Sequence, residues 1–161
     1  MFKALRQAGS GRKERMRYIG KIRELISSRT LRENLVRFRP EATEEELRAA
    51  VKAACLEDVV AEVGLDARLG ERGVGLSEGP APRVAVARAL LSGAPILLLD
   101  EDTSALDEGT EARMLKNIGE MRERTVIIVT HWRAALENCD YRLHIEDGRM
   151  TREAISGGKG L

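Results

Sequence analysis

The chain has 161 residues, of which 43% are hydrophobic, 33% charged and 3% aromatic. This composition is typical of one soluble globular domain rather than a disordered chain, and no apolar run approaches the roughly 18 residues of a membrane span. The net charge of +1 combines a basic head with an acidic remainder, because residues 1–29 hold nine Lys or Arg and two Glu, which leaves 18 bases and 24 acids in the rest.

The basic head could bind nucleic acid or an anionic membrane surface. Phe2 is the single aromatic residue before Tyr18, so nucleic-acid bases would find little to stack on. We therefore favour a solvated basic helix or a frayed terminus. The head lacks the apolar core of a secretory signal, so we expect a cytoplasmic location.

Two cysteines, Cys55 and Cys139, are far apart and in no CxxC pair. Small buried residues are a better interpretation than metal ligands or a disulfide.

Helical signals fill the first half of the chain. Thr43 followed by Glu46 is a capping-box pattern. The apolar residues after it recur at helical spacing in two runs, which predict a helix of three turns and a shorter one: Leu47, Val51 and Ala54, then Leu56, Val59, Val60 and Val63. Residues 69–79, LGERGVGLSEG, are expected to form a loop, and residues 80–91, PAPRVAVARALL, a helix.

Strand signals dominate the second half. Residues 96–99 and 126–129 are continuous apolar runs rich in branched side chains, as in parallel strands buried on both faces. The helix expected between them has an apolar residue at every third position: Ala112, Leu115, Ile118 and Met121. Strand, helix and strand predict an α/β unit with a right-handed connection. A last strand over residues 141–145 is expected to end in a turn at Asp147 and Gly148.

Two polar residues follow the apolar strands. Ligands of an open parallel sheet bind beyond the carboxyl ends of the strands, where Asp100 and His131 lie. We expect these two residues to face one crevice, about one strand spacing apart if the strands are neighbours. Adjacent acids are usually a helix cap or a solvated loop, and a lone histidine is usually structural, but the position after a strand favours a site.

The motifs around these residues have a recognisable order. Residues 96–107, ILLLDEDTSALD, resemble a Walker B strand with its D-loop. Ser77, in LSEGP, lies 23 residues before Asp100, and His131, at the end of TVIIVTH, lies 31 residues after it. LSEG alone is a weak motif, but LSEG, RVAVARALL, LLLDEDTSALD and TH in this order resemble the ATP-binding cassette (ABC) ATPases.

The resemblance implies a role for each site residue, with ATP and Mg²⁺ as cofactors. Asp100 would hold the metal, Glu101 would polarise the attacking water and His131 would contact the γ-phosphate. Ser77 and Gly79 match the LSGGQ signature, which binds the nucleotide of a second nucleotide-binding domain. Asp107 would lie at that dimer contact.

Within the signature, two substitutions weaken the match. Glu78 replaces a glycine and would bring a negative charge near a phosphate. Pro80 replaces the glutamine and, with Pro82, removes backbone donors from a helix N-terminus that would otherwise bind an anion. We therefore expect a weakened signature.

Two further segments resemble exporters in particular. Gly70, Glu71, Arg72 and Gly73 resemble the GERG loop that contacts the transmembrane domain of an exporter. Residues 30–35, TLRENL, resemble the exporter segment that follows the Q-loop. Both favour an exporter over the DNA-repair and chromosome-structure members of the superfamily.

The phosphate-binding P-loop of the family is absent from these residues. No stretch of the 161 residues reads GxxxxGK[ST], and the GGKG of the tail lacks the preceding strand and the spacing. Residues 1–29 have no glutamine at the expected place and are expected to be out of register with the family. The P-loop strand normally fills the middle of the sheet, so we expect residues 96–99 to have unpaired edges and the isolated chain to be poorly stable unless a partner, or a helix from the basic head, covers them.

The sequence thus predicts an α/β fold, a partial P-loop NTPase (RecA-like) parallel sheet with the ABC α-helical subdomain. The expected parts are a basic segment of uncertain register (1–29), the helical subdomain with the signature motif and its helix (30–93), the C-terminal half of the cassette core (94–150) and a flexible tail (151–161). The predicted function is the ATP-binding and ATP-hydrolysing part of an ABC exporter, at the inner face of the membrane.

Because the P-loop is missing, we do not expect the chain to hydrolyse ATP alone; a separate P-loop-bearing chain could complete it. Two alternatives stay open. One is an inactive, truncated cassette remnant that at most docks on an intact nucleotide-binding domain. The other is a basic-headed nucleic-acid-binding protein, which predicts salt-sensitive DNA binding that deletion of residues 1–29 abolishes.

Overall fold

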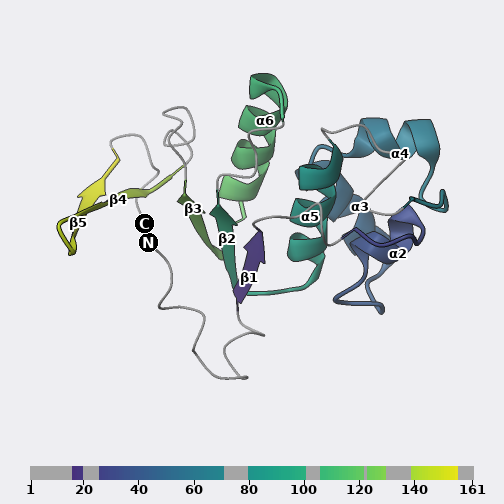
Figure 1. Cartoon of the computed structure of the whole chain (residues 1–161), viewed down its shortest axis with the longest axis horizontal. Helices are drawn as coiled ribbons and strands as arrows, with labels where there is room; N and C mark the ends of the chain where they lie inside the picture. The colour runs from purple at the N-terminus through teal and green to yellow at the C-terminus, as the bar shows by residue number, and fades with distance from the viewer. Residues whose placement is uncertain are drawn as a thin grey trace.

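A computed structural model describes residues 16–19, 26–70, 80–100, 106–121, 123–129 and 139–155, with the backbone alone for residues 16–19 and Asp100. The described elements, in chain order, are β1 (Met16–Ile19), α2 (Leu31–Leu35), α3 (Glu44–Ala53), α4 (Glu57–Val63), α5 (Pro80–Leu91), β2 (Ile96–Asp100), α6 (Glu108–Gly119), β3 (Thr125–Val129), β4 (Tyr141–Glu146) and β5 (Arg149–Ala154). Figure 1 shows the sheet in the middle, helices α2 to α5 gathered at one end and the β4–β5 hairpin at the other.

The central sheet has three parallel strands in the order β1-β2-β3. Strand β2 lies between the other two, and its residues Leu97, Leu98 and Leu99 are buried. The prediction of two parallel strands joined by a helix is confirmed. The prediction that residues 96–99 have unpaired edges is wrong, because β1, from the basic head, pairs with one edge of β2 and β3 pairs with the other.

Helix α6 connects β2 to β3, as the three-residue spacing predicts. Its buried side chains Met114, Leu115 and Ile118 join the hydrophobic core, whereas Ala112 is exposed. Ala112 belongs to the predicted apolar stripe, so its exposure corrects that stripe, and Met114 is buried instead. The buried apolar face of α6 anchors the strand–helix–strand unit.

Helices α3 and α4 form where the sequence predicts them. The Thr43 side chain accepts from the Glu46 N–H while the Glu46 carboxylate accepts from the Thr43 N–H, which is the expected capping box. Leu47 and Val51 of α3 are buried, as is Val59 of α4.

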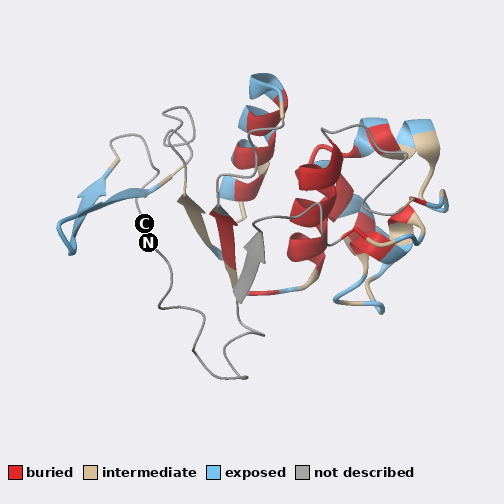
Figure 2. Ribbon diagram, viewed as in Figure 1, coloured by how far each residue is buried: buried red, intermediate tan, exposed pale blue. Residues whose placement is uncertain are grey.

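All twelve residues of α5 are buried (Figure 2). This helix contacts α2 and α3 at one end of the molecule and β1 of the sheet. A helix that is buried around its whole circumference must have neighbours on every side. Helix α5 is therefore the element through which the helical end and the sheet share one core.

The hairpin of β4 and β5 separates its side chains by face. The register pairs Leu143 with Arg152 and Ile145 with Met150, so these four share one face, whereas Arg142, His144 and Glu146 lie on the other. Large apolar side chains on the first face are strongly exposed: Tyr141, Leu143, Ile145 and Met150. We expected β4 but not β5, whose last four residues, 151–154, fall in the segment assigned to the tail.

The turn of this hairpin agrees with the prediction. Asp147 and Gly148 have φ values of 48° and 74° and join β4 to β5. Two residues with positive φ match the twist of an antiparallel pair, and Asp-Gly is a favoured sequence for them.

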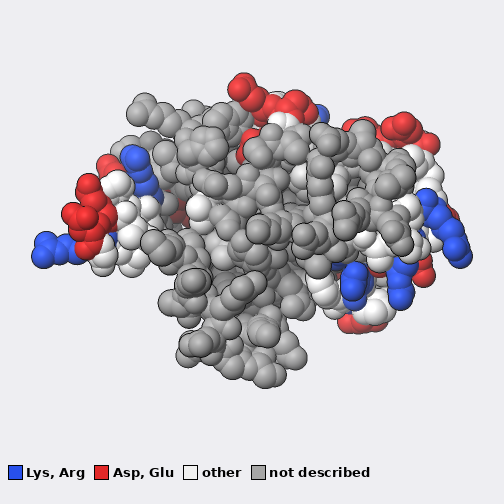
Figure 3. Space-filling view, viewed as in Figure 1, with Lys and Arg blue, Asp and Glu red and all other residues white. Residues whose placement is uncertain are grey.

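Cys55 is buried, as expected, but Cys139 is only half-buried, which corrects the prediction for that residue. Among the described helices, none combines the length and apolarity needed to cross a membrane. On the face seen in Figure 3, the described acidic and basic side chains occur together at both ends of the molecule.

Candidate functional site

The carboxyl ends of β2 and β3 meet at one edge of the sheet. Asp100, the last residue of β2, pairs in register with Val129, the last residue of β3. The condition for the expected crevice, that the two strands are neighbours, is therefore met. Glu101 follows Asp100 directly, and His131 follows Val129 by two residues; both lie outside the described residues.

Asp107 is the N-cap residue of α6 and is exposed. Its Oδ1 accepts a hydrogen bond of 2.9 Å from the Thr110 N–H, which satisfies one of the donors left free at a helix start. Hydrogen bonds from the side chain and the backbone of Thr110 lower the pKa of the Asp107 carboxyl. The structure thus gives Asp107 a capping role that the sequence analysis missed, although an Asp just before a helix is a strong capping signal.

The start of α5 is fixed by Arg83, which the sequence analysis did not single out. Its Nη1 donates to the Cys55 carbonyl and, over 2.8 Å, to Oδ1 of Asp58. Burial alone would raise the pKa of the Asp58 carboxyl, but these bonds, the charge of Arg83 and the Val59 N–H together lower it. Ser77, Gly79 and the substitution Glu78 lie outside the described residues; Pro80 is the first residue of the helix.

Of the segment expected to contact a transmembrane domain, Gly70 is described and is half-buried, whereas Glu71, Arg72 and Gly73 lie outside the described residues. Just before it, Leu69 is buried and its N–H donates to the Arg29 carbonyl over 2.9 Å. The segment that starts at Gly70 therefore follows a residue, Leu69, that is bonded to the helical end.

Within the described part of the chain, no group of three or more His, Cys, Asp or Glu side chains could hold a metal ion. Asp100 and Glu101 are adjacent carboxylates at a strand end, and carboxylate oxygen is the ligand type that Mg²⁺ prefers. The residue types at this edge fit Mg²⁺.

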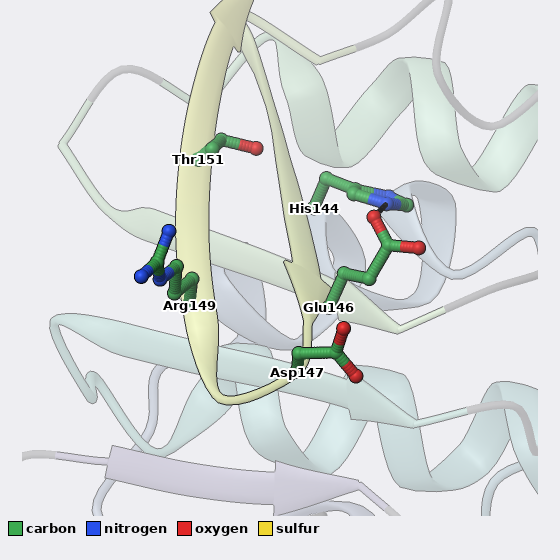
Figure 4. A pocket seen from close by; sticks show the side chains of 5 residues that line it. All are labelled: His144, Glu146, Asp147, Arg149 and Thr151. Carbon is green, nitrogen blue, oxygen red and sulfur yellow. Dashed lines mark ion pairs between the residues drawn. The ribbon is translucent and has the colours of Figure 1, made fainter.

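A shallow hollow on the polar face of the β4–β5 hairpin contains none of the predicted site residues (Figure 4). It is lined by His144 and Glu146 of β4, Asp147 of the turn, and Arg149 and Thr151 of β5. The His144 Nε2 lies 3.5 Å from Oε2 of Glu146. Mixed charges on an exposed two-stranded hairpin give no reason to assign a ligand.

The parallel β1-β2-β3 sheet with its crossover helix and its polar carboxyl edge defines the class: a partial P-loop NTPase fold, as predicted. The solved structure of a bacterial Atm1-family ABC exporter with ATP bound matches 88% of this chain and 26% of its own chain, with a TM-score of 0.77 and 32% identity.

Sequence comparison places the chain more narrowly. The family described as ABC transporter matches residues 4–104, more than half of the chain. The β-(1→2)glucan export ATP-binding/permease protein of Rhizobium johnstonii is 41% identical over 131 residues, which are 80% of this chain and 22% of that protein. The ATP-dependent lipid A-core flippase of Methylobacillus flagellatus is 44% identical over 120 residues, 73% of this chain and 20% of that protein. The chain belongs to the ABC transporter family.

The chain spans about a fifth of the length of these two relatives. The family match begins at residue 4, so it includes most of the basic segment that we expected to be out of register. Strand β1 agrees with this broader match, since residues 16–19 are part of the same sheet as β2.

Proposed function

We propose that this chain is part of the nucleotide-binding domain of an ABC exporter and couples ATP hydrolysis to transport across a membrane. The observation that carries the proposal is the register at the sheet edge, where Asp100 and Val129 are neighbours. The chain segments that follow β2 and β3 therefore begin side by side, at the same edge of the sheet. Relatives whose names include ATP-binding/permease and an exporter with ATP bound support the same activity.

At this edge, Asp100 holds Mg²⁺ and Glu101 polarises the attacking water. His131 donates a hydrogen bond toward the γ-phosphate as a neutral imidazole. Ser77 and Gly79, just before α5, complete the site of a second nucleotide-binding domain, and Asp107, at the start of α6, lies at the contact between the two. ATP bound with Mg²⁺ is the substrate.

The P-loop that grips the phosphates comes from a polypeptide segment outside these 161 residues, which contain no GxxxxGK[ST]. Gly70, Glu71, Arg72 and Gly73 contact the transmembrane domain, which places the chain at the cytoplasmic face of the membrane. Residues 30–93 form the helical subdomain in this proposal, and residues 94–150 belong to the cassette core.

The test is a chimera in which this chain replaces the matching segment of a relative whose P-loop is intact. Glu101→Gln should lower kcat by about 100- to 1,000-fold and change KM little, because the water loses its polarising group and binding contacts remain. Glu120→Gln, the same exchange at an exposed position of α6's C-terminal end, is the control and should keep kcat within about twofold of the parent chimera.

A Glu101→Gln chimera that hydrolyses ATP as fast as its parent would contradict the assignment of Glu101. A parent chimera that assembles and binds ATP but has no activity would instead favour a docking role without catalysis.

A further inference from the structure

Three segments that are far apart in the sequence meet at Cys55. The Cys55 carbonyl accepts from Arg83 of α5, and its Sγ lies 3.7 Å from Nδ2 of Asn117 of α6. Cys55 itself is the turn residue between α3 and α4. Cys55 thus links the end of α3, the start of α4, α5 and α6.

The turn at Cys55 is rigidly defined. Its φ is 54°, in the left-handed region, and its N–H donates to the Lys52 carbonyl over 3.0 Å. The Leu56 N–H donates to the Val51 carbonyl over 2.9 Å. These two bonds form a Schellman motif, which closes the end of α3 and leaves one orientation for the peptide that follows.

Asn117 attaches α6 to this end of α3. Its Nδ2 lies 3.3 Å from the Lys52 carbonyl oxygen and 3.4 Å from that of Ala53, in addition to Sγ of Cys55. The last carbonyls of a helix lack partners within the helix, so an amide from a neighbouring element is a C-cap supplied from outside. Helix α6 follows β2, so this contact joins the helical end to the α/β part.

Arg83 attaches the start of α5 to the same turn. It is 9% exposed and its Nη1 bonds both the Cys55 carbonyl and Asp58 of α4. The planar guanidinium presents several donors at fixed angles, so it holds two acceptors in a defined arrangement. These bonds couple the position of the first turn of α5 to that of the α3–α4 turn.

The far end of α5 is attached separately. Nη1 of Arg124, next to β3, donates to the Leu90 carbonyl over 2.7 Å. That end of α5 is bound to the α/β part. The Cys55 junction, which consists of Cys55, Arg83 and Asn117, therefore determines the position of the first turn of α5.

We propose that Asn117 and Arg83 are positioning residues that act through the Cys55 turn and set the place of the first turn of α5 relative to α6. The proposal rests on the proposed function only for its consequence: Ser77 and Gly79 come just before α5, and Asp107 caps α6. The junction then sets the start of α5, at Pro80, relative to Asp107, the N-cap of α6.

Hydrogen–deuterium exchange of the full chain, without nucleotide, tests this alignment. Asn117→Asp keeps the size of the side chain but replaces a donor with a carboxylate facing two carbonyl oxygens. We expect amide exchange at Val84 and Ala85 to become about tenfold faster while exchange in β2 is unchanged, because only the attachment of α5 opens. Lys116→Ala, at an exposed position on the same helix, is the matched control and should change neither.

Arg83→Lys supplies the second arm, since it keeps the charge and loses the forked geometry. If both residues act through one turn, the double variant should exchange about as fast in α5 as either single variant. If Asn117→Asp does not fold, Asn117→Ala takes its place in the single and double variants.

Unchanged exchange in α5, equal acceleration in β2, or effects of the two substitutions that simply add would each overturn the proposal. Because no nucleotide is present, such a result leaves the proposed ATPase function untouched.

Discussion

Asn34 has no solvent-exposed surface, and both polar ends of its amide are bonded. Its Oδ1 accepts from the Ser27 N–H over 3.0 Å, and its Nδ2 donates to the carbonyls of Ser27 (3.1 Å) and Thr30 (2.9 Å). The residue fastens the segment before α2 to the helix itself. A buried amide with all its partners is stabilising, and its loss leaves several backbone groups without bonds.

Asn34→Asp should lower the free energy of unfolding by about 3 kcal/mol at pH 7, because a buried carboxylate cannot donate to either carbonyl. The difference from the parent should shrink toward pH 4, where a protonated carboxyl donates again. Urea denaturation at both pH values measures it.

Glu45→Gln, at an exposed position of α3, is the control and should change the free energy of unfolding by less than about 0.5 kcal/mol. An Asn34→Asp protein as stable as the control would show that the amide bonds of Asn34 contribute little.

Elements marked by helical spacing or by a continuous apolar run could be predicted from the sequence to within two residues: α3, α4, α5, β2, β3 and β4, and with a shifted start α6. Three others were missed for separate reasons. Residues 16–19 include Arg17 and form no apolar run, and β5 (RMTREA) has only two apolar residues, Met150 and Ala154, on an exposed hairpin. Helix α2 is too short for periodicity, but Thr30 and Glu33 form a capping box that would have found it.

Strand β1 covers one edge of β2, so its removal should expose that edge. A chain lacking residues 1–19 should be less thermally stable than the full chain and should self-associate. A chain lacking residues 1–15, which keeps β1, is the matched control and should stay close to the parent. Thermal denaturation and light scattering of the two deletions compare them directly; equal behaviour would mean that β1 contributes nothing to the sheet.

Small side chains let α5 approach its neighbours closely. Ala87 has no exposed surface, so Ala87→Leu should overpack the core and lower the free energy of unfolding by about 1–3 kcal/mol. Ala112→Leu adds the same atoms at an exposed position of α6 and should cost under about 0.5 kcal/mol. Similar urea midpoints for the two variants would contradict tight packing around α5.

At the scale of the whole molecule, the order of the motifs predicted the family, and the two apolar runs predicted the shared sheet edge that β2 and β3 form. The sequence could not indicate the Cys55 junction, because its members lie in the α3–α4 turn, α5 and α6 and no spacing relates them. It also gave no sign that β1 pairs with β2, since pairing between distant strands depends on tertiary packing rather than on local pattern.

Stability should depend on pH through groups distributed over the fold. Hydrogen bonds within helix caps lower the pKa of three carboxyl groups: Glu33 through Thr30, Glu46 through Thr43 and Asp107 through Thr110. A lowered folded pKa means that the unfolded state binds more protons in acid. Their contribution is therefore complete above the unfolded values of about 4 and is lost as the pH falls through the folded values.

We expect the free energy of unfolding to fall below about pH 4.5, and the combined variant Glu33→Gln, Glu46→Gln and Asp107→Asn to show a shallower fall. In alkali, burial raises the pKa of the Cys55 thiol, so its contribution is lost as the pH rises past about 8.5. Urea titrations from pH 3.5 to 9 measure both limbs; identical acid limbs in parent and variant would contradict the role of the caps.

The pairing of β1 with β2 also governs how this chain can fold. Met16 meets Ile96, eighty positions later, and every helix of the helical end lies between them. Closing such a loop costs about 4 kcal/mol of chain entropy beyond a constant, and it must be closed before the strand pair contributes. On the ribosome, β1 is synthesised long before β2, so it has no strand to pair with while α2 to α5 form. Contacts of this sequence separation slow folding, and the docking of β1 becomes the step that completes the sheet.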